Sequence, residues 1–295
     1  MSGSEEKNSG DTSAQELVDT LFGQREELSV HEKNSRAAHK ELPNFLFGRS
    51  DAQDALPLSD VSYYEATVIE EDNLKFLAPY IDELSLFETR WGYKKGGETR
   101  DEWCRRMEMQ AVPVLNELTK VCAEEGLFHP QALYFYVHCT ADGETLKILP
   151  KNEKDASPEL HFPRLANGCC ICDRFRHPDS SGSCDVAGLI AVNLGKTVSE
   201  TVKQWQKEER FEEARLLSGY AKELLKAMTE YAATVMTKEG VCVGPLHFFG
   251  TPETCPAKVQ SDLLGILPSE LIGISFSRSY LMMPEYTALA MLLPR

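Results

Sequence analysis

The chain has 295 residues, 42% of them hydrophobic, so it is long enough to bury a large core in one or two domains. Its formal charge is −15, from 46 acidic and 31 basic residues, and no stretch is rich in Lys and Arg. Nucleic acids and anionic membranes are bound through clustered cations, so neither is expected as a partner. No continuous apolar window reaches the roughly 18 residues of a membrane span.

The N-terminal region predicts an extension in front of a folded body. Residues 1 to about 13 are polar and predict disorder, and the apolar spacing between Gln15 and Leu28 favours a short amphipathic helix that docks on the body. The start lacks the features of a signal peptide, and nine unevenly spaced cysteines are typical of reduced thiols. We expect a cytoplasmic protein with an extension over residues 1–41, disordered or partly helical, and one domain over residues 42–295.

The first half of that domain alternates strand and helix patterns. A helix predicted from about Arg100 to Glu125 has apolar residues at helical spacing and ends at Gly126, in the usual C-terminal role of glycine. Two apolar runs around Ala-Asp-Gly then predict a hairpin. In chain order, the patterns predict a strand over Tyr63–Ile69, a short helix over Asp72–Ile81, and hairpin strands over Leu133–Cys139 and Thr145–Leu149.

The second half centres on one long helical pattern, which runs from about Ser199 to Lys238 with a buried apolar face. An apolar strand, Val186–Leu194, precedes it. A short helix over Lys258–Leu267 and strands over Leu271–Ser277 and Thr287–Leu293 are predicted after it. We expect an α+β fold, with a twisted, mainly antiparallel sheet packed by the long helices.

Cysteines between the hairpin and the long helix raise a metal or redox hypothesis. Cys169 and Cys172 have the spacing of half a zinc site, which Cys184, His161 or His177 could complete. A second Cys-x-x-Cys pair is missing, and a free cysteine is commonly a small buried apolar residue. Hydrolase, phosphate-loop, metalloprotease and dinucleotide motifs are absent, so no catalytic residue is assigned.

Several short segments, in order along about 230 residues, resemble the C-terminal activation domain of cobalamin-dependent methionine synthase. Tyr80-Ile81-Asp82 and the downstream Leu86 to Trp91 resemble the family's Ile-Asp-Trp segment and aromatic cluster. Phe162-Pro163-Arg164 is similar to its Pro-Arg segment. Cys170 to Asp173 is similar to its Cys-Leu-Ala-Asp segment, and Met283 to Ala290 to its Met-x-Pro stretch.

The resemblance implies S-adenosylmethionine binding and support of cobalamin reactivation. It places Asp82 against the ligand's amino group, in keeping with the electrostatics of a carboxylate facing a cation. Cobalamin would be carried by a partner, a cobalamin-binding methyltransferase or corrinoid protein, because the chain lacks an Asp-x-His-x-x-Gly motif. A flavodoxin-type protein would supply the electron. The other candidate ligand-binding residues are Arg164, His247, Phe249, Gly250, Cys255 and Pro256.

The chain departs from the family pattern in its main ligand loop. The family loop carries an Arg that takes the ligand's carboxylate, whereas Val243 to Pro256 contains no arginine and offers His247, Phe248 and Phe249 instead. The sequence also ends at Arg295, before the family's closing aromatic pair. Two further hypotheses therefore stay open: a non-catalytic binding or assembly protein for a corrinoid methyltransferase, and a cysteine-based metal or redox protein.

Overall fold

One curled antiparallel sheet organises the protein. The structure is a computed structural model that describes residues 64–151, 157–178, 183–249, 257–277 and 281–294. Its main sheet has the strand order β4-β3-β2-β5-β9-β6, and β1 pairs with β2 beside β3. The strands are β1 (Thr67–Glu70), β2 (Gln131–Asp142), β3 (Thr145–Ile148), β4 (Glu159–His161), β5 (Asp185–Asn193), β6 (Leu246–Phe248) and β9 (Thr287–Leu292), and β7 (Ser275–Phe276) pairs separately with β8 (Met282–Met283).

The predicted hairpin is confirmed at the start of this sheet. β2 and β3 pair antiparallel from Asp142↔Thr145 to Cys139↔Ile148, and Gly143 in the turn has a φ of 58°, which glycine adopts without strain. β2 continues along β5 from Gln131↔Asn193 to Cys139↔Asp185. The predicted strands over Val186–Leu194 and Thr287–Leu293 are also confirmed, as β5 and β9.

The predicted single helix over Ser199–Lys238 is wrong: two helices occupy it, α4 (Thr197–Lys207) and α5 (Phe211–Lys238). The chain turns at Glu209, which has a φ of 62°, a left-handed conformation that cannot continue a helix. The Arg210 guanidinium lies 4.6 Å from the centre of the Trp205 ring and bonds Glu213, which holds the turn. α5 alone has 28 residues, about 42 Å of helix.

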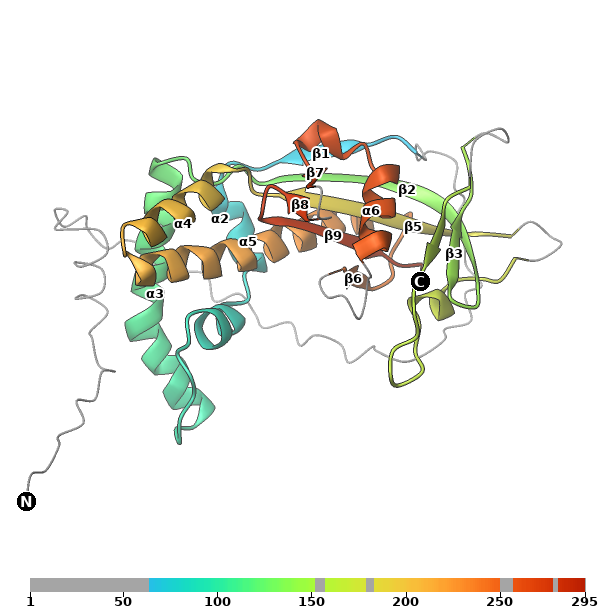
Figure 1. Ribbon diagram of the computed structural model, residues 1–295. Helices are drawn as coiled ribbons and strands as arrows, with labels where there is room; N and C mark the ends of the chain where they lie inside the picture. The colour runs from blue at the N-terminus through green and yellow to red at the C-terminus, as the bar shows by residue number, and fades with distance from the viewer. Residues whose placement is uncertain (1–63, 152–156, 179–182, 250–256, 278–280, 295) are drawn as a thin grey trace, which may run out of the picture.

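The sheet separates two cores because its side chains alternate between faces. On one face, the even-numbered β2 residues from Ala132 to Tyr136 pack against the helices α3, α4 and α5. On the other face, Leu133, Phe135 and Val137 pack against α6, η3 and η4. Figure 1 shows α5 and α4 on one side of the strands and α6 over the other. The expected α+β class, a mainly antiparallel sheet packed by helices, is confirmed.

Most of the remaining predicted elements are found with shifted bounds, and one is largely wrong. α3 (Arg100–Glu124) begins at a Thr99 capping box, and Gly126 follows its end with a φ of 60°. The predicted strand over Leu271–Ser277 is largely wrong, because a helical turn, η4 (Ser269–Ile272), fills its first half and only β7 is extended. The other helical pieces are α2 (Leu74–Leu77), η1 (Ala78–Tyr80), the π-helical turn η2 (Ser85–Arg90), η3 (Ile171–Arg174) and α6 (Ala257–Ile266).

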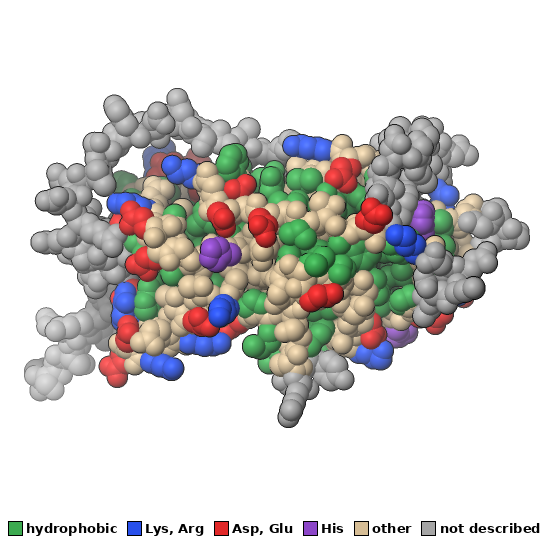
Figure 2. Space-filling model, turned by 90° about the horizontal axis from the view of Figure 1, so that it is seen from above, with side chains coloured by type: hydrophobic (Ala, Val, Ile, Leu, Met, Phe, Trp, Pro, Cys, Tyr) green, Lys and Arg blue, Asp and Glu red, His purple; other side chains and the backbone are tan. Residues whose placement is uncertain are grey.

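Hydrophobic side chains gather on the middle of the face seen in Figure 2. Three large apolar side chains are each more than half exposed: Leu271 in η4, Leu281 just before β8, and Met283 in β8. Within the described residues no helix is long and apolar enough to cross a membrane. The predicted N-terminal extension, residues 1–41, lies outside the described residues.

Candidate functional site

Asp82 lies where the short helical segment η1 meets η2 on the surface of α5. Its Oδ1 accepts a hydrogen bond from the backbone N–H of Ser85 at 3.0 Å, the geometry of a helix cap. Its Oδ2 lies 3.6 Å from Nζ of Lys226 on α5. The side chain stays 45% exposed, so Asp82 combines a capping role with a carboxylate edge open to a ligand.

Lys226 stands between two carboxylates. Besides Asp82, its Nζ lies 3.9 Å from Oε1 of Glu230, one helical turn further along α5. Burial raises the pKa of Glu230, and the neighbouring carboxylates of Asp82 and Glu223 raise it further, while Lys226 lowers it. The cluster therefore holds more acidic than basic groups in a partly desolvated place, which suits a ligand that brings positive charge.

A buried ion pair fixes this segment to α5. The Glu223 side chain is 1% exposed, and its Oε1 accepts hydrogen bonds from the Ser85 hydroxyl and from Nε of Arg90, both at 3.0 Å. Ser85 thus links Asp82 to Glu223. The other carboxylate oxygen of Glu223, Oε2, is buried without a hydrogen-bond partner in the described structure, so most of its stabilisation comes through Oε1.

Two tyrosines flank the acidic cluster in sequence and meet in space. The rings of Tyr80 and Tyr231 make an edge contact with centroids 5.7 Å apart. Tyr80 precedes Asp82 by two residues, and Tyr231 follows Glu230 directly. Both tyrosines are only partly buried, so aromatic surface is available beside the carboxylates.

The rings of His247 and Phe249 lie with the core on the face of the sheet opposite this cluster. Their rings lie 5.2 Å apart, and Phe249 stacks on Phe162 at 5.8 Å within the core under α6. The Nε2 of His247 is buried without a hydrogen-bond partner in the described part of the chain. Burial lowers the pKa of His247, so the ring is neutral near pH 7.

Arg164 is engaged in a loop contact. Its guanidinium forms a fork on the Asp173 carboxylate, with both N–O distances 2.9 Å, and also donates to the Gly168 carbonyl at 2.8 Å. Arg164 lowers the pKa of Asp173 through this pair. Among described residues, no contact joins Arg164 or His247 to Asp82. Gly250, Cys255 and Pro256, also predicted at the ligand site, lie outside the described residues.

The candidate thiols do not assemble into one centre. Cys172 is buried beside Cys170, whose Sγ caps the turn η3 and contacts the Phe162 carbonyl. Cys184 instead lies on another segment, with Sγ 3.4 Å from Nδ1 of His138. Across the described ranges, no three His, Cys, Asp or Glu side chains are grouped to hold a metal ion. Cys169 is a partly exposed free thiol.

Sequence reasoning missed the part of the site that α5 supplies. Lys226 and Glu230 are four positions apart, which places both on one face of a helix. That spacing was visible as a polar stripe on a long helix. The sequence gives no indication that the segment around Asp82 packs against this stripe of α5. The ion pairs in the structure show that it does.

Comparison with known proteins identifies the fold. No protein-family model matches the chain, and no curated protein matches its sequence. Among solved structures, the α+β architecture matches a crystal structure of the MetH reactivation domain bound to AdoHcy. The TM-score is 0.61 at 17% sequence identity, and the alignment covers 79% of each chain. The chain therefore has the fold of the MetH reactivation domain, as the sequence resemblance predicts.

Proposed function

We propose that the protein binds S-adenosylmethionine at the Asp82–Lys226 pair and supports reductive methylation of cobalamin carried by a partner protein. The observation that carries the proposal is a half-exposed carboxylate, on a fold shared with a domain whose structure holds AdoHcy, at the position where the sequence resemblance expects it. The partner would be a cobalamin-binding methyltransferase or corrinoid protein, with a flavodoxin-type electron donor.

Asp82 and Lys226 together complement an amino-acid head group. The methionyl end of S-adenosylmethionine carries an ammonium and a carboxylate on one carbon. Asp82 offers a partner to the ammonium, and Lys226, 3.6 Å away, offers one to the carboxylate. In this proposal Lys226 takes the role of the arginine that the loop from Val243 to Pro256 lacks.

The surroundings suit the rest of the ligand's charge. A sulfonium is a weakly hydrated cation, which aromatic faces and nearby carboxylates stabilise. Glu230 and the Tyr80–Tyr231 pair supply such surroundings beside Asp82. The ligand would supply the methyl group, and the contribution of this chain is to bind and orient it toward the partner's cobalamin, which is catalysis by proximity.

Calorimetry of S-adenosylmethionine and S-adenosylhomocysteine binding tests the proposal, with wild type beside Asp82→Ala. Saturable binding that weakens by about 1.5–3 kcal/mol in the variant, the value of a hydrogen bond to a charged group, is the supporting result. Because Asp82 also accepts a hydrogen bond from the Ser85 backbone N–H at the start of η2, Asp82→Ser keeps an accepting side chain without the charge and serves as the matched variant. A folded wild type that binds neither ligand refutes the proposal.

A second candidate function is a non-catalytic assembly protein for a corrinoid methyltransferase. The missing loop arginine and the engagement of Arg164 with Asp173 favour it, because both remove a strong binder of the ligand's carboxylate. In that case the protein would raise the thermal midpoint of the methyltransferase without ligand. Equal stabilisation with and without S-adenosylmethionine, together with no binding in calorimetry, distinguishes this function from the first.

A further inference from the structure

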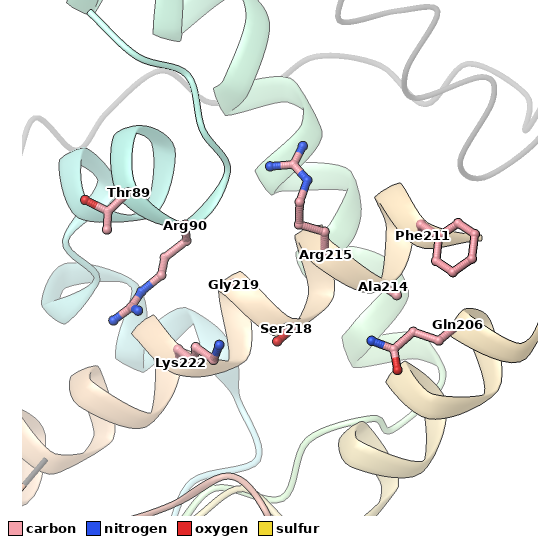
Figure 3. Close-up of a pocket in the computed structure, with 9 residues that line it drawn as sticks. All are labelled: Thr89, Arg90, Gln206, Phe211, Ala214, Arg215, Ser218, Gly219 and Lys222. Carbon is pink, nitrogen blue, oxygen red and sulfur yellow. The ribbon is translucent and has the colours of Figure 1, made fainter. Parts of the chain in front are cut away.

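A surface cleft of about 350 Å³ opens beside the Asp82 cluster, between η2 and the adjoining ends of α4 and α5. Its volume falls within the range of small-molecule sites. Figure 3 shows Gly219 between the side chains of Arg90, Arg215 and Lys222, with Ser218 and Gln206 on the side toward α4. The lining residues are Thr89, Arg90, Gln206, Phe211, Ala214, Arg215, Ser218, Gly219 and Lys222.

The charge of this lining is opposite to that of the whole protein. Three lining residues are cations and none is acidic, although the chain carries 46 acidic residues against 31 basic. An anion is therefore the kind of ligand that the cleft attracts.

The three cations differ in how far they are already neutralised. Arg215 gives Nε and Nη2 to Glu212 and Nη1 to the Trp91 carbonyl, so its donors are largely used. Among the described residues, Arg90 gives only its Nε, to Glu223. Lys222 is exposed and has no ion pair with any described residue. The ammonium of Lys222 and the terminal amino groups of Arg90 remain as charged donors.

Neutral donors complete the lining. The Ser218 hydroxyl oxygen accepts a hydrogen bond from the Tyr286 hydroxyl at 3.0 Å, which leaves the serine proton for another acceptor. Thr89 and Gln206 add a hydroxyl and an amide from the other walls. Donors from several directions match a phosphate better than a carboxylate, because a phosphate has more acceptor oxygens.

The cleft also has an apolar wall, and beside it lies a close contact of η2 with α5 that only glycine allows. Phe211, at the start of α5, is 63% exposed beside the cations. At Gly219, an added Cβ would lie 2.9 Å from Cδ1 of Trp91 and 3.0 Å from Cβ of Arg90. The absent side chain therefore lets Arg90 and Trp91 pack closely against α5 beside the cleft.

We propose that this cleft binds a small molecule that carries a phosphate group, with Lys222, Arg90 and Ser218 on the phosphate and Phe211 against an apolar or ring portion. The site uses different residues from the Asp82–Lys226 pair, so it does not depend on the S-adenosylmethionine proposal.

Titration with pyrophosphate and phenyl phosphate, followed by calorimetry and by the backbone amide signal of Gly219 in NMR, tests the proposal. Phenol serves as the uncharged ligand. Lys222→Gln is expected to weaken both phosphate compounds about tenfold, the loss of one charge-assisted hydrogen bond. Lys238→Gln, an exposed lysine at the far end of α5, changes the net charge equally and is expected to leave affinity unchanged. Phe211→Ala is expected to weaken phenyl phosphate alone.

Three results would overturn the proposal. One is a folded wild type that shows no saturable binding of either phosphate compound at millimolar concentration. Another is an equal loss in Lys222→Gln and Lys238→Gln, which would show attraction by overall charge. A third is binding of phenol as tight as that of phenyl phosphate, which would show an apolar site. An acidic peptide that binds where both phosphate compounds fail would assign the cleft to a protein contact instead.

Discussion

Replacing Lys226 by glutamine gives the most direct test of whether Lys226 binds the carboxylate of a ligand at the Asp82 site. If Lys226 holds the ligand's carboxylate, the variant binds S-adenosylhomocysteine more weakly. If the ligand's carboxylate lies as far from Nζ of Lys226 as Asp82 does, at 3.6 Å, the two unit charges interact by about 1 kcal/mol in water and several times that at a low-dielectric surface. Because Lys226 and Asp82 are 38% and 45% exposed, a value near the aqueous limit applies, so we expect a loss of about 1 kcal/mol.

Calorimetry with two ligands separates this role from a general effect on the site. Methylthioadenosine keeps the nucleoside and the thioether but lacks the amino-acid head group, so its affinity is expected to be the same in wild type, Lys226→Gln and Asp82→Ala. Tighter binding of S-adenosylhomocysteine by Lys226→Gln would refute the reasoning. That result would mean that Lys226 competes with the ligand's ammonium for Asp82 rather than holding its carboxylate.

Three further predictions concern stability. Gly219→Ala forces the Trp91 ring away from α5 and is expected to lower the free energy of unfolding by about 1–3 kcal/mol. Gly265→Ala, in α6 with open space around its Cα, is neutral or stabilising in the same denaturant titration. Burial lowers the folded-state pKa of His247 below its unfolded value, so stability that is present above about pH 6.5 is lost as the pH falls through that value. Thermal midpoints between pH 7.5 and 5 are therefore expected to fall less in His247→Phe, and an equal fall contradicts this assignment. Tyr136→Phe removes hydrogen bonds to the Glu239 carboxylate and the Met236 carbonyl, and a cost below about 0.5 kcal/mol would contradict their role.

The sheet was largely predictable because its signals are local. The Ala-Asp-Gly turn between two apolar runs determines the hairpin, and the alternation along β2 divides its side chains between the two cores. The break between α4 and α5 was not predictable. Glu208, Glu209 and Arg210 are all compatible with a helix, and the turn depends on the contact of Arg210 with Trp205.

The candidate site was half predictable for a similar reason. Asp82 follows from a short motif in one segment. Its partner Lys226 lies 144 positions further along the chain, and only tertiary packing brings the two together. For Arg164 the motif was also present in the sequence. In the structure, however, its guanidinium is paired with the Asp173 carboxylate of the same loop region and not with Asp82.

The buried Glu223 carboxylate connects the two proposed binding sites. Ser85 bonds both Asp82 and Glu223, and Glu223 in turn holds Arg90, which lines the phosphate cleft. Because Oε2 of Glu223 has no partner among described residues, a ligand that draws Arg90 away leaves a buried charge poorly compensated. If both proposed sites bind their ligands and Arg90 moves in doing so, occupancy of one site would change the affinity of the other, and thermodynamic linkage requires that effect to be reciprocal. Titrating one ligand at several fixed concentrations of the other would measure that coupling energy directly.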